Sequence, residues 1–270
     1  MRTVAVVLAG GTGQRFGAAT YAPAANVPGD GPTAGAAAAM SRPRQAAGMP
    51  KQLMSLAGVT LLERSVAAFE QAAGIDEILV VMAAGLTELA RQVLPADRYR
   101  KLTGIIDGGN ARADSTRRAI SALSAGPHGA GGAVADCNVL FHDAARPLVS
   151  QRIIGDCTAA LDSWQAVGVV VAASDTMAEL SDGAIGRVLP RTSLARCQTP
   201  QGFRLSVIAR AHDLAAADPA FSAAAATDDC GVVLRYLPDV PIRAVTGSER
   251  NLKITYPEDL AVAEFLLARE

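Results

Sequence analysis

The stretch Leu8-Ala9-Gly10-Gly11-Thr12-Gly13-Gln14-Arg15-Phe16-Gly17 follows a short apolar run, residues 3–7, at the start of the chain. The apolar run predicts a buried parallel strand that leads into this loop. The loop glycines permit unusual backbone conformations and let N–H groups approach an anion closely. Arg15 adds a planar guanidinium suited to phosphate oxygens. The stretch therefore predicts a loop that binds a nucleotide triphosphate.

Two better-known phosphate loops fit this stretch less well. A dinucleotide-binding loop would place a third glycine where Phe16 stands, which disfavours an NAD-dependent oxidoreductase. A P-loop would require Gly-Lys-Ser/Thr after a strand, and the sequence has no such tripeptide. A glycine turn that only joins a strand to a helix stays open as an alternative.

The composition is that of an ordinary globular protein. The chain has 270 residues, a net charge of −1 and 50% hydrophobic residues, which suits one domain over residues 1–270. Nothing indicates a basic surface for nucleic acid, and the longest apolar run, 167–173, is too short to cross a membrane. The four cysteines form no Cys-x-x-Cys pair. We therefore expect a cytoplasmic protein that binds neither nucleic acid nor membrane.

Residues 18–49 interrupt the regular pattern, because 20 of these 32 residues are Ala, Gly or Pro. Such a segment buries little apolar surface, so we expect a flexible insertion. Pro50 and Lys51 follow it. Only three of the 25 basic residues are lysines, which favours a specific role for Lys51 at the edge of the glycine loop over a solvated surface position.

Further along, strand and helix patterns alternate. Strands are expected at residues 77–83, 103–107, 139–141, 166–173, 242–245 and 251–255. Helices are expected at 60–72, 86–93, 153–164 and 205–217, from the glycine turn 108–115 to about 123, and from 257 onward. Alternation of this kind predicts an α/β fold with a Rossmann-like, doubly wound and mostly parallel sheet. Ligands then bind at the carboxyl ends of the strands.

Two further motifs follow predicted strands and so fall on that edge. The glycines and Ser115 of Gly108-Gly109-Asn110-Ala111-Arg112-Ala113-Asp114-Ser115 could contact the edge of a base, or the segment could be a plain turn that opens a helix. Asp143 ends a strand opposite the triphosphate loop, where a carboxylate suits Mg²⁺. Pairing with Arg146, or capping of the next turn, is the alternative for Asp143.

Residues 173–197 predict a protruding β-hairpin, with Asp182-Gly183 as its turn. Residues 199–203 are expected to close this arm before the helix 205–217. A two-stranded ribbon is marginally stable alone in water, so this arm is expected to dimerise. Thr227-Asp228-Asp229 reads locally as a helix N-cap with acids in the first turn.

The motifs LAGGTGQRFG, PKQ, GGNARADS, HDAARP, SDT, TPQGF, TDD and NLKITYPEDL, in this order, resemble the 2-C-methyl-D-erythritol 4-phosphate cytidylyltransferases of isoprenoid precursor biosynthesis. The resemblance implies a glycosyltransferase-A-like nucleotidyltransferase fold and a homodimer with exchanged arms. It implies transfer of CMP from CTP to 2-C-methyl-D-erythritol 4-phosphate, by in-line attack on the α-phosphate with release of pyrophosphate.

Residue roles follow from the same resemblance. CTP would be bound by Ala9, Gly10, Gly11, Gly13, Gly109, Asn110, Ser115 and Ala144, and Mg²⁺ by Asp143. Catalysis would use Arg15 and Lys51 to stabilise the transition state, and Arg191 and Lys253 to place the acceptor. Acceptor binding would also use Arg146, Thr176, Thr199 and Thr227, with Thr176 and Arg191 serving the partner's site. The chain departs from the family's pattern in the insertion 18–49, which separates Arg15 from Lys51, and in a longer loop after residue 123.

Three other functions remain open at this stage. A cytidylyltransferase for another polyol phosphate, such as ribitol 5-phosphate, would use the same CTP residues. A sugar-1-phosphate nucleotidyltransferase would use a different base. A noncatalytic nucleotide-binding regulator would not need Arg15, Lys51 and Asp143, all of which are present.

Overall fold

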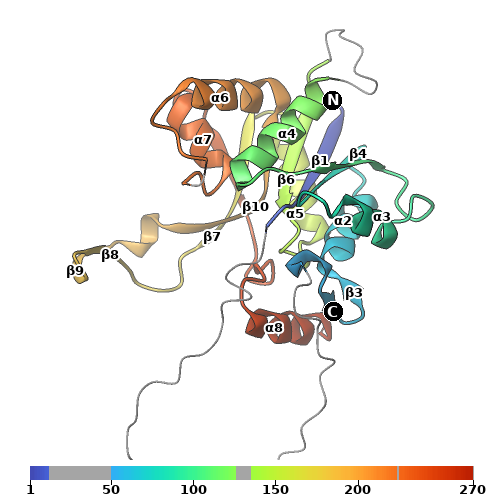
Figure 1. Cartoon of the computed structure of the whole chain (residues 1–270). Helices are drawn as coiled ribbons and strands as arrows, with labels where there is room; N and C mark the ends of the chain where they lie inside the picture. Colours follow the sequence, from blue (N-terminus) through green and yellow to red (C-terminus); the bar gives the residue numbers. More distant parts are fainter. Residues whose placement is uncertain (12–49, 126–134, 224, 270) are drawn as a thin grey trace, which may run out of the picture.

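The computed structural model describes residues 1–11, 50–125, 135–223 and 225–269. Its centre is a seven-stranded sheet in the order β11-β7-β10-β6-β1-β4-β5 (Figure 1). The strands are β1 (Thr3–Ala9), β4 (Glu77–Met82), β5 (Leu102–Asp107), β6 (Asn138–Asp143), β7 (Ala166–Ala172), β10 (Ala195–Arg204) and β11 (Ile242–Thr246). All neighbours pair in parallel except β10, which is antiparallel to both β6 and β7. The expected mostly parallel sheet is confirmed.

Helices cover both faces of this sheet, which explains why β1 is apolar at every position from Val4 onward. Ala5, Val7 and Ala9 pack on one face with α2 (Leu61–Gln71), α3 (Thr87–Val93) and α5 (Gln151–Ala160). Val4, Val6 and Leu8 pack on the other with α4 (Arg112–Ser124), α6 (Leu205–Ala217) and α7 (Asp229–Tyr236). Alternate residues of a strand face opposite sides of a sheet, so a strand buried on both sides needs apolar residues throughout.

Smaller elements lie around this body. The 3₁₀ turn η1 (Lys51–Leu53), the short pair β2 (Ser55–Leu56) and β3 (Val59–Thr60), and the last helix α8 (Pro257–Leu267) lie together below the sheet in Figure 1. Leu56, Leu61, Leu148, Ile254 and Ala263 form their shared core. Within the described ranges, no helix is long and apolar enough to span a bilayer.

Helix starts follow local signals in the sequence. Thr60 caps α2, with its hydroxyl accepting from the Glu63 N–H and the Glu63 carboxylate accepting from the Thr60 N–H. Asp228 caps α7 by accepting from the Gly231 N–H. The helix-cap interpretation of Thr227-Asp228-Asp229 is therefore confirmed as the local structure.

Two expectations about strands were wrong. Residues 251–255, called here the 251–255 segment, form neither strand nor helix, and the Ile254 N–H donates to the Ala145 carbonyl. Residues 199–203 do not merely close the arm, because they belong to β10 in the interior of the sheet. The polar residues Gln198, Thr199 and Gln201 are buried there, and the register shifts between Gln198 and Gln201. Buried polar residues obscure the apolar pattern by which a central strand is recognised.

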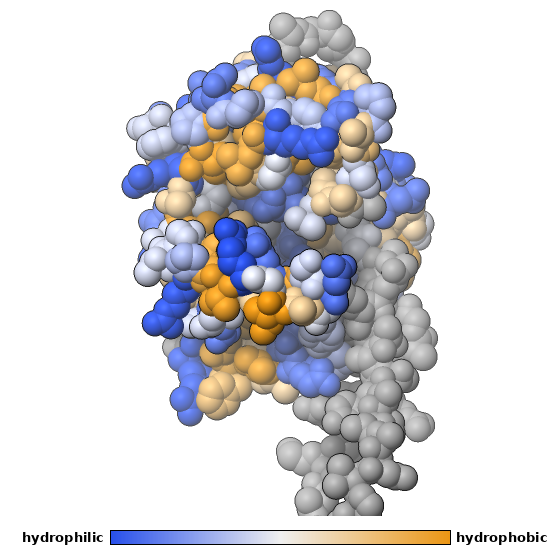
Figure 2. Space-filling model, turned by 90° about the vertical axis from the view of Figure 1, so that its left-hand side faces the viewer, coloured by the Kyte–Doolittle hydropathy of each residue, from blue (hydrophilic) through white to orange (hydrophobic). Residues whose placement is uncertain are grey.

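The predicted hairpin is present as the separate two-stranded sheet of β8 (Met177–Ser181) and β9 (Ala184–Leu189). It projects away from the body (Figure 1), and η2 (Arg191–Ser193) follows it. Figure 2 views the molecule from the side to which the hairpin points, and hydrophobic residues reach the surface there among hydrophilic ones. The insertion 18–49 lies outside the described residues.

A candidate active site at the carboxyl ends of the parallel strands

A cavity of about 250 Å³ opens where β1, β5 and β6 end. Its lining includes nine residues that the sequence assigned to a site: Ala9, Gly10, Gly11, Lys51, Asn110, Ser115, Asp143, Ala144 and Lys253. Gln52, Ala111, Arg112, Ala145 and Leu8 complete it. These residues come from separate motifs along the chain, and the fold brings them together at the edge that the parallel topology predicts.

The glycine loop is packed closely against α4. A Cβ on Gly10 would lie 3.1 Å from the Ser115 Oγ, so a larger residue would require the Ser115 side chain to shift by a few tenths of an ångström. The buried Gln52 side chain donates from Nε2 to the Ala9 carbonyl, at 2.6 Å, and thereby ties η1 to the end of β1. Gly13 and Arg15 lie outside the described residues.

The Gly108–Ser115 motif forms the part of the wall that adjoins the glycine loop. The buried Ser115 hydroxyl accepts from the Gly109 N–H at 3.1 Å and donates to the Ala111 carbonyl at 3.2 Å. A Cβ on Gly109 would meet the Asp114 Cβ at 2.2 Å, so this position requires glycine. Gly109 lies not in the cavity lining but in an adjoining depression that also contains Asn110.

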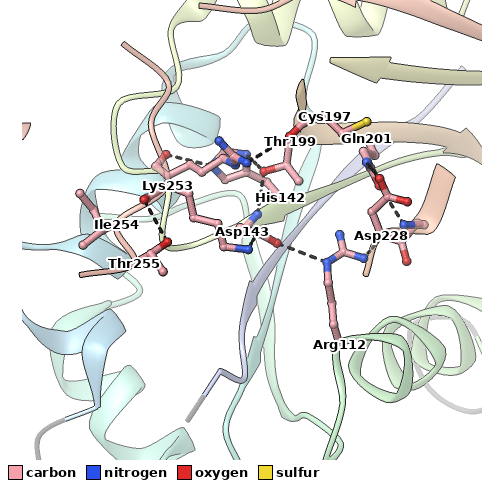
Figure 3. Close-up of polar contacts among 12 residues, drawn as sticks. Arg112, His142, Asp143, Cys197, Thr199, Gln201, Asp228, Lys253, Ile254 and Thr255 are labelled. Atoms are coloured by element: carbon pink, nitrogen blue, oxygen red, sulfur yellow. Dashed lines mark hydrogen bonds and ion pairs between the residues drawn. The ribbon is translucent and has the colours of Figure 1, made fainter. Parts of the chain in front are cut away.

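Asp143 is held between two cations at the floor of the cavity (Figure 3). Its Oδ2 accepts from the Lys253 Nζ at 2.7 Å, and its Oδ1 lies 3.4 Å from the Arg112 Nε. Burial alone would raise the pKa of this carboxyl, but Arg112 and Lys253 outweigh burial and hold the pKa well below its usual range. Asp143 is therefore ionised at neutral pH.

The alternative pairing of Asp143 with Arg146 was wrong. The Arg146 guanidinium instead donates to the carbonyls of Asn251, at 2.8 Å, and Cys197, at 3.4 Å. Arg146 thus joins the turn after β6 to β10 and to the 251–255 segment, and it does not line the cavity.

His142 and Thr199 hold the end of β6 from behind the cavity. The Thr199 hydroxyl accepts from the Asp143 N–H at 3.0 Å and contacts the His142 Nδ1 at 3.1 Å. The His142 Nε2 contacts the Arg146 carbonyl at 3.1 Å. These bonds are all satisfied if Thr199 donates to a neutral His142 that carries its proton on Nε2. Thr199 is buried, so the structure places it beneath the cavity rather than in it.

Three other expected acceptor-binding residues lie elsewhere. Thr176 and Arg191 are at the base of the hairpin arm, and the structure does not bring them to the cavity of their own chain. Thr227 lines a separate pocket of about 220 Å³ beside α7.

Arg112 is the charged residue of the described cavity lining that sequence reasoning missed. Its Nη1 donates to the buried Asp229 at 2.7 Å, so one guanidinium contacts carboxylates from both β6 and α7. The available signal was an arginine at the first position of a helix that follows a glycine turn, where a surface cation is the ordinary interpretation.

Asp143 is the only carboxylate among the described residues that line the cavity, and the described residues contain no group of three or more potential metal ligands. Mg²⁺ commonly takes one or two carboxylates and completes its shell with substrate phosphates and water. An ionised Asp143 fits that requirement, because a carboxylate has about four acceptor positions and its two cations use two.

The pKa of His142 predicts how stability changes with pH. Burial lowers this pKa from 6.5 to about 4, so below pH 6.5 the unfolded chain binds a proton that the folded chain does not. The stabilisation is full above about pH 6.5 and is lost as the pH falls toward 4, by about 3 kcal/mol for this shift. We expect the free energy of unfolding, measured with urea at stepped pH, to fall more steeply in this window than that of His142→Gln. The glutamine can still donate to Arg146 but does not titrate; parallel curves for the two proteins would contradict the assignment.

Comparisons with known proteins agree with this geometry. A family model described as "IspD: 2-C-methyl-D-erythritol 4-phosphate cytidylyltransferase" matches residues 34–269. The 2-C-methyl-D-erythritol 4-phosphate cytidylyltransferase of Thermobifida fusca (strain YX) is 45% identical over 273 residues, which cover 98% of this chain and 93% of that protein. The bifunctional ribulose 5-phosphate reductase/CDP-ribitol pyrophosphorylase Bcs1 of Haemophilus influenzae is 35% identical, over 83% of this chain and 45% of that protein.

Solved structures show the same fold. The 2-C-methyl-D-erythritol 4-phosphate cytidylyltransferase of Thermus thermophilus superposes with a TM-score of 0.64 at 32% identity, over 82% of this chain and 94% of that one. The 4-diphosphocytidyl-2C-methyl-D-erythritol synthase of Anaerococcus prevotii superposes with a TM-score of 0.73 at 21% identity, over 99% of this chain and 96% of that one. On the family model and the T. fusca relative, the chain belongs to the 2-C-methyl-D-erythritol 4-phosphate cytidylyltransferase (IspD) family.

Proposed function

We propose that this chain transfers CMP from CTP to 2-C-methyl-D-erythritol 4-phosphate, in the cavity at the ends of β1, β5 and β6, as a cytoplasmic enzyme of isoprenoid precursor biosynthesis. Family membership supplies the reaction. The observation that supports the location is the cavity itself, where the glycine loop, Lys51, Lys253 and the ionised Asp143 meet. A triphosphate needs such a combination of backbone N–H donors and cations.

Within this cavity one glycine motif binds the triphosphate of CTP and the other binds its cytosine. Ala9, Gly10 and Gly11 lie at the phosphate end, beside Lys51. Asn110 and Ser115, at the start of α4, hold the cytosine, with Gly109 at the edge and Ala144 beside Asp143. The buried Ser115 hydroxyl holds the loop that would contact the base.

The acceptor phosphate attacks the α-phosphorus of CTP in line, and pyrophosphate leaves. A phosphate monoester is already ionised at neutral pH, so the protein needs to supply no general base. It contributes position and charge stabilisation, which dominate phosphoryl-type transfers. Lys51 stabilises charge that develops on the transferred phosphate, and Lys253, held on Asp143, orients the acceptor.

We assign Mg²⁺ to Asp143. When bound, the ion would neutralise triphosphate charge and hold its oxygens in one arrangement. Lys253 and Arg112 keep the Asp143 carboxylate ionised and fix its position. No other carboxylate belongs to the described lining of the cavity.

Ribitol 5-phosphate is the second candidate acceptor, and the similarity to a CDP-ribitol pyrophosphorylase favours testing it. We expect pyrophosphate release from CTP and Mg²⁺ with 2-C-methyl-D-erythritol 4-phosphate and not with ribitol 5-phosphate. Release with ribitol 5-phosphate alone would overturn the acceptor and keep the CTP site. Tight CTP binding without turnover on either acceptor would favour a noncatalytic regulator.

Lys51 can be tested against a matched lysine. Lys51 donates from Nζ to the Ile254 carbonyl at 2.7 Å, and Lys101 donates from Nζ to the Ala72 carbonyl, also at 2.7 Å, but only Lys51 lines the cavity. We expect Lys51→Ala to lower kcat by about 10²–10³, as for loss of one preorganised transition-state donor, with little change in Lys101→Ala. Equal effects of the two substitutions in steady-state assays would reject the role of Lys51.

The hairpin arm is proposed as the dimer contact. Ala178, Leu180, Ile185 and Val188 share one face of the ribbon, because paired residues of neighbouring strands point to the same side. Leu180, Ile185 and Val188 are between 58% and 73% exposed. Such an apolar face on an isolated ribbon is typical of an interaction surface. Thr176 and Arg191, at the base of the arm, would then reach the acceptor in the partner's cavity.

Exchange of arms predicts rescue between two inactive variants. In a heterodimer of Lys51→Ala and Arg191→Ala chains, one site receives an intact Lys51 and an intact Arg191 from different chains. We therefore expect co-expressed, tagged heterodimers to be clearly more active than either homodimer. Heterodimers of Lys51→Ala with Lys253→Ala are the control, because both residues line one chain's cavity and neither site is intact. Absence of rescue in the first pair would place Arg191 outside the partner's site.

A further inference from the structure

Asp229 is a fully buried carboxylate that does not touch the cavity. It is the first residue of α7 and is 1% exposed. Its Oδ1 accepts from the Thr116 hydroxyl at 2.9 Å, and its backbone N–H donates to the Gln201 Oε1 at 2.9 Å. Its Oδ2 accepts from the Arg112 Nη1 at 2.7 Å. Asp229 is thus fixed by contacts from its own helix α7 to α4 and β10.

Arg112 connects this buried carboxylate with Asp143. The two carboxylates contact different nitrogens of one planar guanidinium, Nη1 and Nε. Because a guanidinium is rigid, fixing one nitrogen limits where the others can lie. Asp229 makes the shorter contact, 2.7 Å against 3.4 Å, so it determines the position of Arg112 more than Asp143 does.

The charges alternate along the chain Asp229–Arg112–Asp143–Lys253, which spans α7, α4, β6 and the 251–255 segment. Without Asp229, Arg112 would keep only the longer contact to Asp143. Its guanidinium could then move together with Asp143 or turn toward solvent. Asp143 would then be oriented by Lys253 alone, whose side chain is 39% exposed.

We propose that Asp229 is a positioning residue for the reaction: by holding Arg112, it orients Asp143 in the cavity without contacting any substrate. The expected effect on kcat rests on the proposed function. The expected effect of Asp229 on the position of Arg112 is independent of that function. The opposing possibility is that Asp229 only stabilises the packing of α7 against α4.

The kinetic test uses Asp229→Asn, which keeps the shape of the side chain and an oxygen for Thr116 but removes the charge facing Arg112. We expect kcat to fall by about 10- to 100-fold, the usual range when a partner that orients a ligating group is lost, and KM for CTP to change much less. Arg112→Lys keeps the charge but cannot bridge both carboxylates, so it should lower kcat similarly. The double variant should lose no more than the larger single loss.

A core substitution separates positioning from stability. Ile154→Ala removes a fully buried side chain of α5 in the opposite core and should destabilise the fold by an amount comparable to loss of a buried charge partner. The proposal is overturned if kcat falls equally in Ile154→Ala and Asp229→Asn. It is also overturned if the double variant Asp229→Asn/Arg112→Lys loses the sum of the two single losses, expressed as free energies. If Asp229→Asn does not fold, Arg112→Lys decides: wild-type kcat in that variant overturns the proposal.

A readout independent of turnover is the Nε–H signal of Arg112 in a ¹⁵N spectrum, assigned by its absence in Arg112→Lys. We expect a distinct signal protected from solvent exchange in wild type and Ile154→Ala, and its shift or loss of protection in Asp229→Asn. An unchanged signal in Asp229→Asn would overturn the proposal even if the wild type proved inactive with the substrates proposed above. Failure of the wild type to turn over, with the expected change in this signal, would reject the proposed function alone.

Discussion

The ionised carboxylate of Asp143, held between Lys253 and Arg112 at the end of β6, is the interaction on which the site depends. Burying a charge is costly unless it is paired and hydrogen-bonded. The surrounding structure meets this requirement from several sides: two cations contact the carboxylate oxygens, and Thr199 accepts from the Asp143 N–H. Removing any one of these partners leaves a charge or a polar group without compensation, so the fold and the site are coupled here.

Strand β10, which is antiparallel in the otherwise parallel sheet of the described residues, supplies part of this requirement. Strand β10 runs between β6 and β7 and brings three polar side chains, Gln198, Thr199 and Gln201, into the interior. Thr199 contacts His142 and Asp143, and Gln201 accepts from the N–H of Asp229 at the start of α7. Gln198 receives a bond from the Asn251 amide and so anchors the segment that carries Lys253. A parallel strand of apolar residues in this position could not make these contacts.

Much of the fold could be predicted from local patterns. The capping box at Thr60 and Glu63, the Asp182-Gly183 turn and the helix 205–217 all depend on residues close together in the chain, and all are confirmed. The strand β10 was missed because its polar residues are satisfied by partners 27 to 57 positions away. The same reason accounts for the 251–255 segment, which has the composition of a strand but bonds to the turn after β6 instead of to a sheet.

The sequence by itself determined that glycine motifs and acids would follow parallel strands, and hence that Gly10, Ser115 and Asp143 would meet at one edge of a sheet, because parallel strands end on the same side. It also carried the family resemblance. Only the tertiary structure decided which charges pair. Arg112 and Arg146 are both arginines in quoted motifs, yet one bridges Asp143 and Asp229 while the other bonds to backbone carbonyls. The reason is physical: an ion pair depends on a few ångströms of distance and on burial, which are set by the packing of α4, α7 and β10 and leave no local pattern in the chain.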